Sequence, residues 1–262
     1  MKTIWKDIQK HLLSGVSFMM PVVVAGGVIL AVSLLGATQT ETGLVPNGPL
    51  LTYLNQLGKA GMAMMIPVFA AYISYSVAGK PGLTPGFILG YIANNAIMIN
   101  GVEVKAGFLG ALILGLLAGY MAKWMKGLKV GKTIRSIMPI LVIPISTVLV
   151  LGLAYYFIIG YPISFLMQAL SDLMVTLNGS GKAVLAVFMG FFSEIDFGGP
   201  VTKAVSMFTL SMINEGIMEP NGIFRILVAV PPIGIFLSTI IAKKKYSEEE
   251  RDNAKAVGIM GC

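Results

Sequence analysis

The chain has 262 residues, of which 56% are apolar and only 12% are charged. A water-soluble fold of this size needs far more charge on its surface, so the composition excludes a soluble domain and a disordered chain. The net charge is +7, but the basic residues lie between long apolar runs, which argues against a nucleic-acid partner. With one cysteine, Cys262, and one histidine, His11, we expect no disulfide, no metal site, no cofactor and no catalytic triad.

Five apolar runs are long enough to cross a bilayer, which takes about 20 helical residues. They cover residues 12–36, 60–79, 106–122, 134–159 and 222–242. Three shorter runs are interrupted or flanked by Gly, Pro, Asn or charge, and are candidates for broken or re-entrant segments: 86–99, 183–193 and 200–213. The sequence predicts an all-α polytopic membrane protein, a bundle of about seven to eight transmembrane segments.

Lysine and arginine collect in cytoplasmic loops and therefore indicate the orientation of the segments. If the eight segments cross alternately and the N-terminus is inside, 15 of the 19 basic residues lie on the inner side. The exceptions are Lys59, Lys105, Lys182 and Arg225. We expect both termini in the cytoplasm and an external loop over 37–59.

Four polar or amphipathic segments flank the spans. Residues 1–11 place apolar side chains on one helical face and lysines nearer the other, which predicts an interfacial N-terminal helix. Residues 162–177 have apolar positions at helical spacing and predict a helix along the interface or on the bundle. We interpret 123–135, with five cations, and 243–255 as cytoplasmic loops, although 123–135 is also a candidate docking site for lipid headgroups or a partner.

The segment 191–206, FFSEIDFGGPVTKAVS, is the first candidate for a ligand site. Glu194, Asp196 and Lys203 lie between two short apolar runs, and Gly198, Gly199 and Pro200 interrupt the backbone. Ionisable groups are costly at membrane depth unless a cavity or substrate satisfies them, and broken helix tips are where transporters hold polar ligands. The segment is also compatible with an ordinary cytoplasmic turn that carries three charges.

Two other irregular stretches contain polar side chains. In GKPGLTPGFILGYIANNA at 79–96, Asn94 and Asn95 can hydrogen-bond sugar hydroxyls or cap a short helix, and the sequence favours neither. The stretch INEGIMEPNG at 213–222 is interpreted as an external turn with solvated acids, with a substrate role as the alternative.

Three blocks of the sequence stand out by their residues and order: HLLSGVSFMMPVVVAGGVILA at 11–31, GKPGLTPGFILGYIA at 79–93 and DFGGPVTKA at 196–204. In this order they resemble the membrane-embedded IIC component of fructose-type phosphotransferase system (PTS) permeases. The resemblance implies a homodimer in the bacterial inner membrane that binds fructose or a related hexose and carries it inward. It also implies IIB and IIA partners, of which IIB phosphorylates the sugar, and two re-entrant hairpins, the first at 191–206.

The resemblance also assigns residues. Asp196, Gly198, Gly199, Pro200 and Lys203 match the family's polar hairpin, while Glu194 replaces an apolar residue and points to a different sugar. With Asn94 and Asn95, these are the expected substrate-binding residues. The expected structural motif comprises Gly26 and Gly27, together with a PG-rich loop formed by Pro81, Gly82, Pro85 and Gly86.

The sequence thus predicts a single IIC-type transmembrane domain over 1–262, the sugar-binding and translocating component of a phosphoenolpyruvate-dependent system. We expect the C-terminal part of the family domain, with a GITEGAIPF block, to be missing. No residue suits a phosphoryl carrier, because Cys262 lies in an apolar stretch and His11 has no activating partner in the sequence. The alternatives are an ion-coupled secondary sugar transporter that uses Glu194 and Asp196, and a non-transporting regulatory membrane subunit.

Overall fold

The computed structural model describes residues 2–40, 43–99, 101–179, 181–194, 200–214 and 217–260, most of which are helical. The chain divides into two compact units, unit 1 (Met1–Ala169) and unit 2 (Leu170–Cys262), each described by itself below. Among the described residues, five helical segments are long and apolar enough to cross a membrane: Lys6–Ser33, Pro49–Ala78, Gly107–Lys126, Ile134–Leu173 and Glu219–Ile241. The prediction of an all-α polytopic membrane protein is therefore confirmed.

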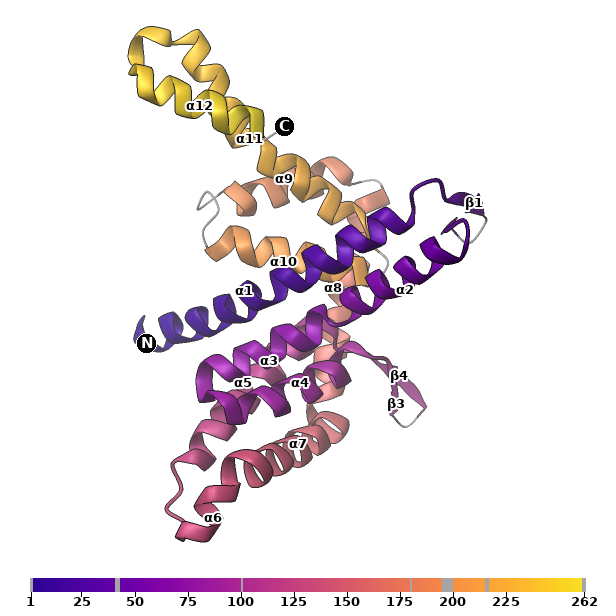
Figure 1. The fold of residues 1–262 in the computed structure, drawn as a ribbon, viewed down its shortest axis with the longest axis vertical. Helices are drawn as coiled ribbons and strands as arrows, with labels where there is room; N and C mark the ends of the chain where they lie inside the picture. The colour runs from indigo at the N-terminus through magenta and orange to yellow at the C-terminus, as the bar shows by residue number, and fades with distance from the viewer. Residues whose placement is uncertain are drawn as a thin grey trace. The chain divides into compact units, whose positions relative to one another are not determined.

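Unit 1 begins with a long helical hairpin that has two short strands at its turn. Its elements are α1 (Lys2–Ser33), β1 (Thr38–Thr40), β2 (Gly43–Val45), α2 (Pro49–Ala63) and α3 (Met65–Ala78). The strands pair antiparallel, with Thr38 opposite Val45. Figure 1 shows α1 lying beside α2 and α3, which follow one another with only Met64 between them. The hairpin thus places two candidate spans side by side.

Polar and small residues set the antiparallel register of this hairpin. At the strand end, the buried Asn55 amide donates a hydrogen bond of 3.0 Å to the Ser33 hydroxyl. Midway along the pair, Gly26 on α1 lies directly against the α2 backbone. Near the N-terminus, His11 Nδ1 lies 2.8 Å from the Ser76 hydroxyl on α3. A membrane offers little hydrophobic drive between helices, so such hydrogen bonds and close contacts hold them together.

The next elements pack around α3. They are α4 (Lys80–Asn94), β3 (Ile97–Ile99), β4 (Val102–Val104) and α5 (Gly107–Lys126), and the three helices contact one another pairwise. Small residues line these contacts. A Cβ at Gly86 of α4 would lie 2.8 Å from the Ala70 carbonyl oxygen, and one at Gly115 of α5 would lie 2.9 Å from the same atom. Glycine is required at both positions because the backbones themselves meet.

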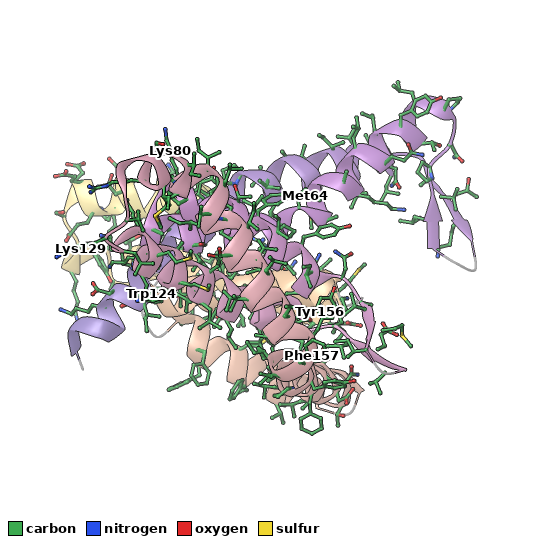
Figure 2. All side chains as sticks on the ribbon, turned by 90° about the horizontal axis from the view of Figure 1, so that it is seen from below. Met64, Lys80, Trp124, Lys129, Tyr156 and Phe157 are labelled. Carbon is green, nitrogen blue, oxygen red and sulfur yellow. The ribbon has the colours of Figure 1, made fainter. Side chains whose placement is uncertain are left out.

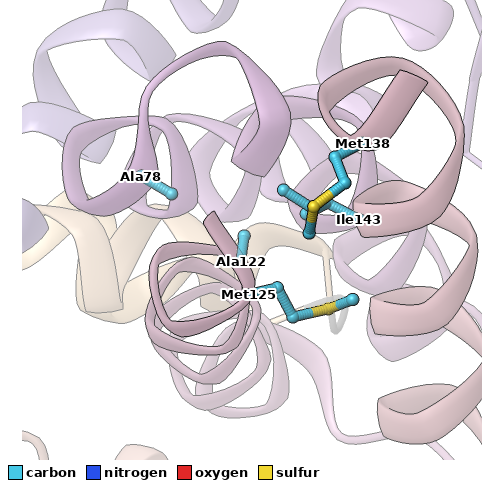
Figure 3. Packing of buried hydrophobic residues seen from close by; sticks show 5 residues of the cluster. All are labelled: Ala78, Ala122, Met125, Met138 and Ile143. Atoms are coloured by element: carbon cyan, nitrogen blue, oxygen red, sulfur yellow. The ribbon is translucent and has the colours of Figure 1, made fainter. Parts of the chain in front are cut away.

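The rest of unit 1 is a nearly continuous helical run. It comprises α6 (Lys132–Ile137), the π-helical segment η1 (Met138–Val142), α7 (Ile143–Ala154), the π-helical segment η2 (Tyr155–Ile159) and α8 (Gly160–Gly179), within which unit 2 begins. A buried cluster attaches the start of this run to α3 and α5. Figure 3 shows its members: Ala78, Ala122, Met125, Met138 and Ile143.

Two lysines of unit 1 lie toward the same end of it. Figure 2 shows Lys80, Trp124 and Lys129 toward one end of the unit, away from Tyr156 and Phe157. Lys80 begins α4 and Lys129 follows α5, and both belong to the basic residues that the sequence assigns to the cytoplasmic side. The helix directions are therefore compatible with the predicted orientation, which remains a prediction.

Unit 2 contains one long helix and several shorter ones. They are α9 (Lys182–Glu194), α10 (Pro200–Asn214), α11 (Glu219–Ile241), the 3₁₀ turn η3 (Lys243–Lys245) and α12 (Glu248–Met260). The helices α9, α10 and α11 contact one another pairwise, and α12 packs on α11. The predicted short runs at 183–193 and 200–213 therefore correspond to real helices.

Two expected loops are helical instead. The external loop predicted over 37–59 contains the first eleven residues of α2. Its polar residue Asn55 is hydrogen-bonded to Ser33 of α1. The expected PG-rich loop of Pro81, Gly82, Pro85 and Gly86 lies in the first two turns of α4. Pro81 is accommodated because it lies in the first turn, where a missing N–H costs no hydrogen bond. Gly82 and Gly86 then face Ser74 of α3.

The flanking segments also differ from expectation. Residues 1–11 are not a separate interfacial helix, since α1 runs without a break from Lys2. The predicted interface helix at 162–177 lies within α8, and the predicted loop at 123–135 begins in α5 and ends in α6. The predicted loop at 243–255 contains most of α12. That helix starts with a capping box, in which the Ser247 N–H donates to Glu250 Oε2 at 2.8 Å and the Glu250 N–H to Ser247 Oγ at 3.3 Å.

Candidate functional site

The segment 191–206 is organised around two helix ends that meet. The helix α9 ends at Glu194 and α10 begins at Pro200, and the two helices pack against each other. The buried Thr202 hydroxyl donates a hydrogen bond to the Ser193 carbonyl oxygen, which ties the first turn of α10 to the last turn of α9. The end of α9 and the start of α10 are therefore held together.

Both helices are short. They have 13 and 15 residues, which corresponds to about 20 and 23 Å at 1.5 Å per residue. A hydrocarbon core is about 30 Å thick. Neither helix alone is long enough to span it, and the re-entrant hairpin expected at 191–206 remains a prediction.

Ser193 adds a polar group that the sequence does not single out. Its side chain is fully buried, and its hydroxyl has no hydrogen-bond partner among the described residues. A buried hydroxyl without a partner costs about 1–3 kcal/mol, which a polar ligand at the hairpin tip would recover. One serine in an apolar run gives no recognisable signal, and only its position next to Glu194 could have indicated it.

The other predicted residues of the hairpin are placed only in part. Glu194 is the last residue of α9 and is half-buried. Pro200 and Lys203 lie in the first turn of α10. Asp196, Gly198 and Gly199 lie outside the described residues, so the structure brings together the two sides of the motif and leaves their roles as predictions.

The two asparagines after the PG motif belong to unit 1. The Asn95 amide donates a hydrogen bond of 2.7 Å to the Tyr91 carbonyl oxygen, which makes it the side-chain cap of α4. The Asn94 side-chain oxygen is buried and has no partner in the described part of the chain. Of the two, Asn94 is the better candidate for a ligand contact.

The remaining residues that the sequence analysis singled out either have packing contacts in the structure or lie outside its described residues. Glu219 begins α11, while Glu215 lies outside the described residues. Gly26 contacts α2, whereas Gly27 has no atom within 4 Å of the position of a Cβ. His11, expected to have no partner, is paired with Ser76 and lies edge-on to Tyr120, with 6.4 Å between ring centroids. These contacts join three helices and describe a packing role.

Comparison with known families matches residues 13–245 to the family described as "Phosphotransferase system, EIIC". The chain belongs to this family. Among curated relatives, the "PTS system fructose-specific EIIC component" of Haloferax volcanii is 38% identical over 97% of this EIIC chain and 72% of the relative. The "Fructose-like permease IIC component 2" of Escherichia coli is 36% identical over 99% of this chain and 70% of the relative. No solved structure matches the chain.

Family membership confirms the resemblance inferred from the three sequence blocks, and it favours the PTS interpretation over an ion-coupled transporter or a regulatory subunit. A third relative, the "Fructose-like PTS system EIIBC component" of Escherichia coli, is 32% identical over 98% of this chain but only 53% of its own length. This EIIC chain is therefore a multi-pass membrane protein of the phosphotransferase system.

Proposed function

We propose that this EIIC chain binds fructose or a closely related hexose and carries it inward for phosphorylation by a IIB partner. The α9–α10 hairpin supports the proposal most directly, because two short apolar helices meet at a segment rich in charge and glycine. The names of the relatives, "fructose-specific" and "fructose-like", support the choice of sugar.

The hairpin tip offers the groups that a sugar needs. A hexose is neutral and presents hydroxyls that both donate and accept hydrogen bonds, so carboxylates at Glu194 and Asp196 accept from it and Lys203 donates to it. Each charge-assisted hydrogen bond contributes about 1.5–3 kcal/mol. The unpartnered Ser193 hydroxyl lies beside Glu194 and supplies a further contact. Movement of the hairpin relative to its surroundings then exposes a sugar hydroxyl to the cytoplasm.

The phosphoryl group travels on partner proteins in this proposal. Relatives named EIIBC and EIIABC components support IIB and IIA partners. The chain's own contribution to the protein-N(π)-phosphohistidine:sugar phosphotransferase is to bind and position the sugar. We further propose that it works as a homodimer in the bacterial inner membrane.

Energy coupling tests this function. Membrane vesicles that contain the chain together with fructose-type IIA and IIB proteins should accumulate sugar phosphate only when phosphoenolpyruvate is supplied, and an uncoupler should have no direct effect. Uptake of free sugar that an uncoupler abolishes would instead establish an ion-coupled transporter. Light scattering on the purified protein should give the mass of a dimer.

The site is tested separately by removing charge. Asp196→Asn and Glu194→Gln each lose a charge-assisted hydrogen bond, so we expect sugar affinity to fall about 10-fold or more. Glu103→Gln is the matched control, because Glu103 is an exposed acid on β4 in the other unit. Wild-type affinity in Asp196→Asn, measured by calorimetry on well-folded protein, would refute the assignment of the site.

A further inference from the structure

The end of α11 and the start of α12 form a helical corner with a defined direction. Gly258 of α12 lies against Phe236 of α11, where a Cβ on the glycine would come within 2.5 Å of the Phe236 Cβ. At the corner, the Tyr246 and Ser238 hydroxyls are 3.0 Å apart. These two contacts show that α12 folds back along α11, with its first turns beside the end of the candidate span Glu219–Ile241.

The charges along α12 follow this direction. Six of the eight residues over 248–255 are charged, whereas the five residues at 256–260, AVGIM, carry no charge. The charged part lies beside the end of the span and the apolar part lies beside Phe236, inside it. This gradient is the one expected for a helix that passes from the polar interface toward the hydrocarbon region.

A cleft of about 400 Å³ lies between the two helices at this level. Its lining changes from apolar to charged across the end of the span. Phe236, Thr239 and Ile240 come from α11, within the span. The charged side chains come from beyond the span's end: Lys243, Glu248, Arg251, Asp252 and Lys255. The volume is within the range of small-molecule sites, about 300–1,000 Å³.

The charges that line the cleft form two neighbouring rows on α12. Glu248 and Asp252 are four residues apart, as are Arg251 and Lys255, so each pair stacks on one helix face and the rows lie side by side. The Arg251 Nε donates to the Ser247 carbonyl oxygen at 3.4 Å, and no ion pair joins the five charged residues in the described structure. Both signs of charge are therefore available to a ligand.

We propose that this cleft binds the headgroup of a phospholipid that carries both a phosphate and a primary ammonium, as phosphatidylethanolamine does. Lys243, Arg251 and Lys255 bind the phosphate. The ammonium donates hydrogen bonds to Glu248 and Asp252. The glycerol and the start of the acyl chains lie on Phe236 and Ile240, whose apolar surface a headgroup alone would leave unused.

Other ligands of related chemistry fit less well. Phosphatidylglycerol carries no positive group, so its headgroup would leave the charges of the two carboxylates uncompensated. A choline headgroup cannot donate hydrogen bonds to them. Free phosphate would use the cations but not the apolar surface from within the span. The mixed lining and the position at the end of the span together select the lipid that we propose.

Lipid binding to the full chain in detergent, measured by native mass spectrometry with defined lipids, tests the proposal. We expect phosphatidylethanolamine to bind more tightly than phosphatidylcholine or phosphatidylglycerol. Lys243→Gln and Lys255→Gln should each weaken it about fivefold, since a basic residue near a membrane surface contributes about 1 kcal/mol. Lys244→Gln and Lys245→Gln are matched controls, because these neighbouring lysines do not line the cleft, and should change affinity less than twofold.

The carboxylates are tested by the pair Glu248→Gln and Asp252→Asn, which should remove the preference over phosphatidylglycerol, with Glu249→Gln as the control. Circular dichroism and gel filtration check that each variant folds. Equal binding of phosphatidylethanolamine and phosphatidylcholine, or tighter binding of phosphatidylglycerol to the wild type, would overturn the proposal. Equal losses in the control lysine variants, or displacement of the lipid by millimolar inorganic phosphate, would also overturn it.

Discussion

The neighbouring glycines Gly26 and Gly27 make a sharp test of how the first helical hairpin packs. A Cβ at Gly26 would lie 2.9 Å from the Met62 nitrogen, 3.0 Å from the Gly61 carbonyl carbon and 3.2 Å from the Gly58 carbonyl oxygen. All three are backbone atoms, which cannot rotate away. A Cβ at Gly27 would meet nothing within 4 Å. Gly26→Ala must therefore push α1 and α2 apart, whereas Gly27→Ala must not.

The expected loss of stability at Gly26 follows from comparing Gly26→Ala with Gly27→Ala. Both replace glycine by alanine at adjacent positions in one helix, so the gain in helix propensity, about 1 kcal/mol, cancels between them. What remains is the cost of overpacking at Gly26, about 1–3 kcal/mol. For a protein of this size that corresponds to about 2–12 °C in melting temperature.

The assay is thermal unfolding of the two purified variants in the same detergent, followed by circular dichroism or fluorescence. We expect Gly27→Ala to melt at or slightly above the wild-type temperature and Gly26→Ala to melt below Gly27→Ala. If the two variants melt within a degree of each other, the close approach of α1 and α2 at Gly26 is wrong.

Further predictions concern two hydrogen-bonded groups. Because Asn55 donates to Ser33 between α1 and α2, a double-mutant cycle with Asn55→Ala and Ser33→Ala should give a coupling of about 0.6–1.7 kcal/mol in unfolding experiments, and zero coupling would exclude the bond. Hydrogen bonds from the Ser247 N–H and hydroxyl lower the pKa of Glu250, so the capping box stabilises α12 above the unfolded pKa of about 4.3 and is lost as the pH falls through the lowered value. Ser247→Ala should raise the Glu250 pKa in a carbon-13 NMR titration, and an unchanged pKa would contradict this capping.

The sequence correctly predicted the membrane spans that can be recognised from their apolar composition alone. Long apolar runs such as that in α5 need no knowledge of neighbours, since about 20 apolar residues suffice. The first eleven residues of α2 were instead expected to be loop, because Asn55 and Lys59 count as polar in isolation. In the structure the Asn55 amide is satisfied by Ser33, a partner 22 residues away that no local pattern reveals.

Local sequence patterns were also insufficient for α4 and for the candidate site at the α9–α10 hairpin. Proline and glycine normally end helices, so the residues from Pro81 to Gly86 suggested a loop, yet Pro81 lies in a first turn and Gly86 faces another backbone. At the hairpin, charge and glycine identified the segment around Glu194. They did not identify Ser193, whose significance lies in burial without a partner, a property of the packed helices.

The small residues on α4 have a consequence for genetic screens. Gly82, Gly86 and Gly90 recur at every fourth position, and at each one a Cβ would come within 2.6–2.7 Å of an atom of α3. Mutational scanning for loss of transport should therefore show a four-residue period of intolerance along 82–90, as severe as any loss at the polar hairpin. A null phenotype in this block would report on assembly of the scaffold, so direct sugar-binding measurements are needed before any of its residues is counted as a sugar contact.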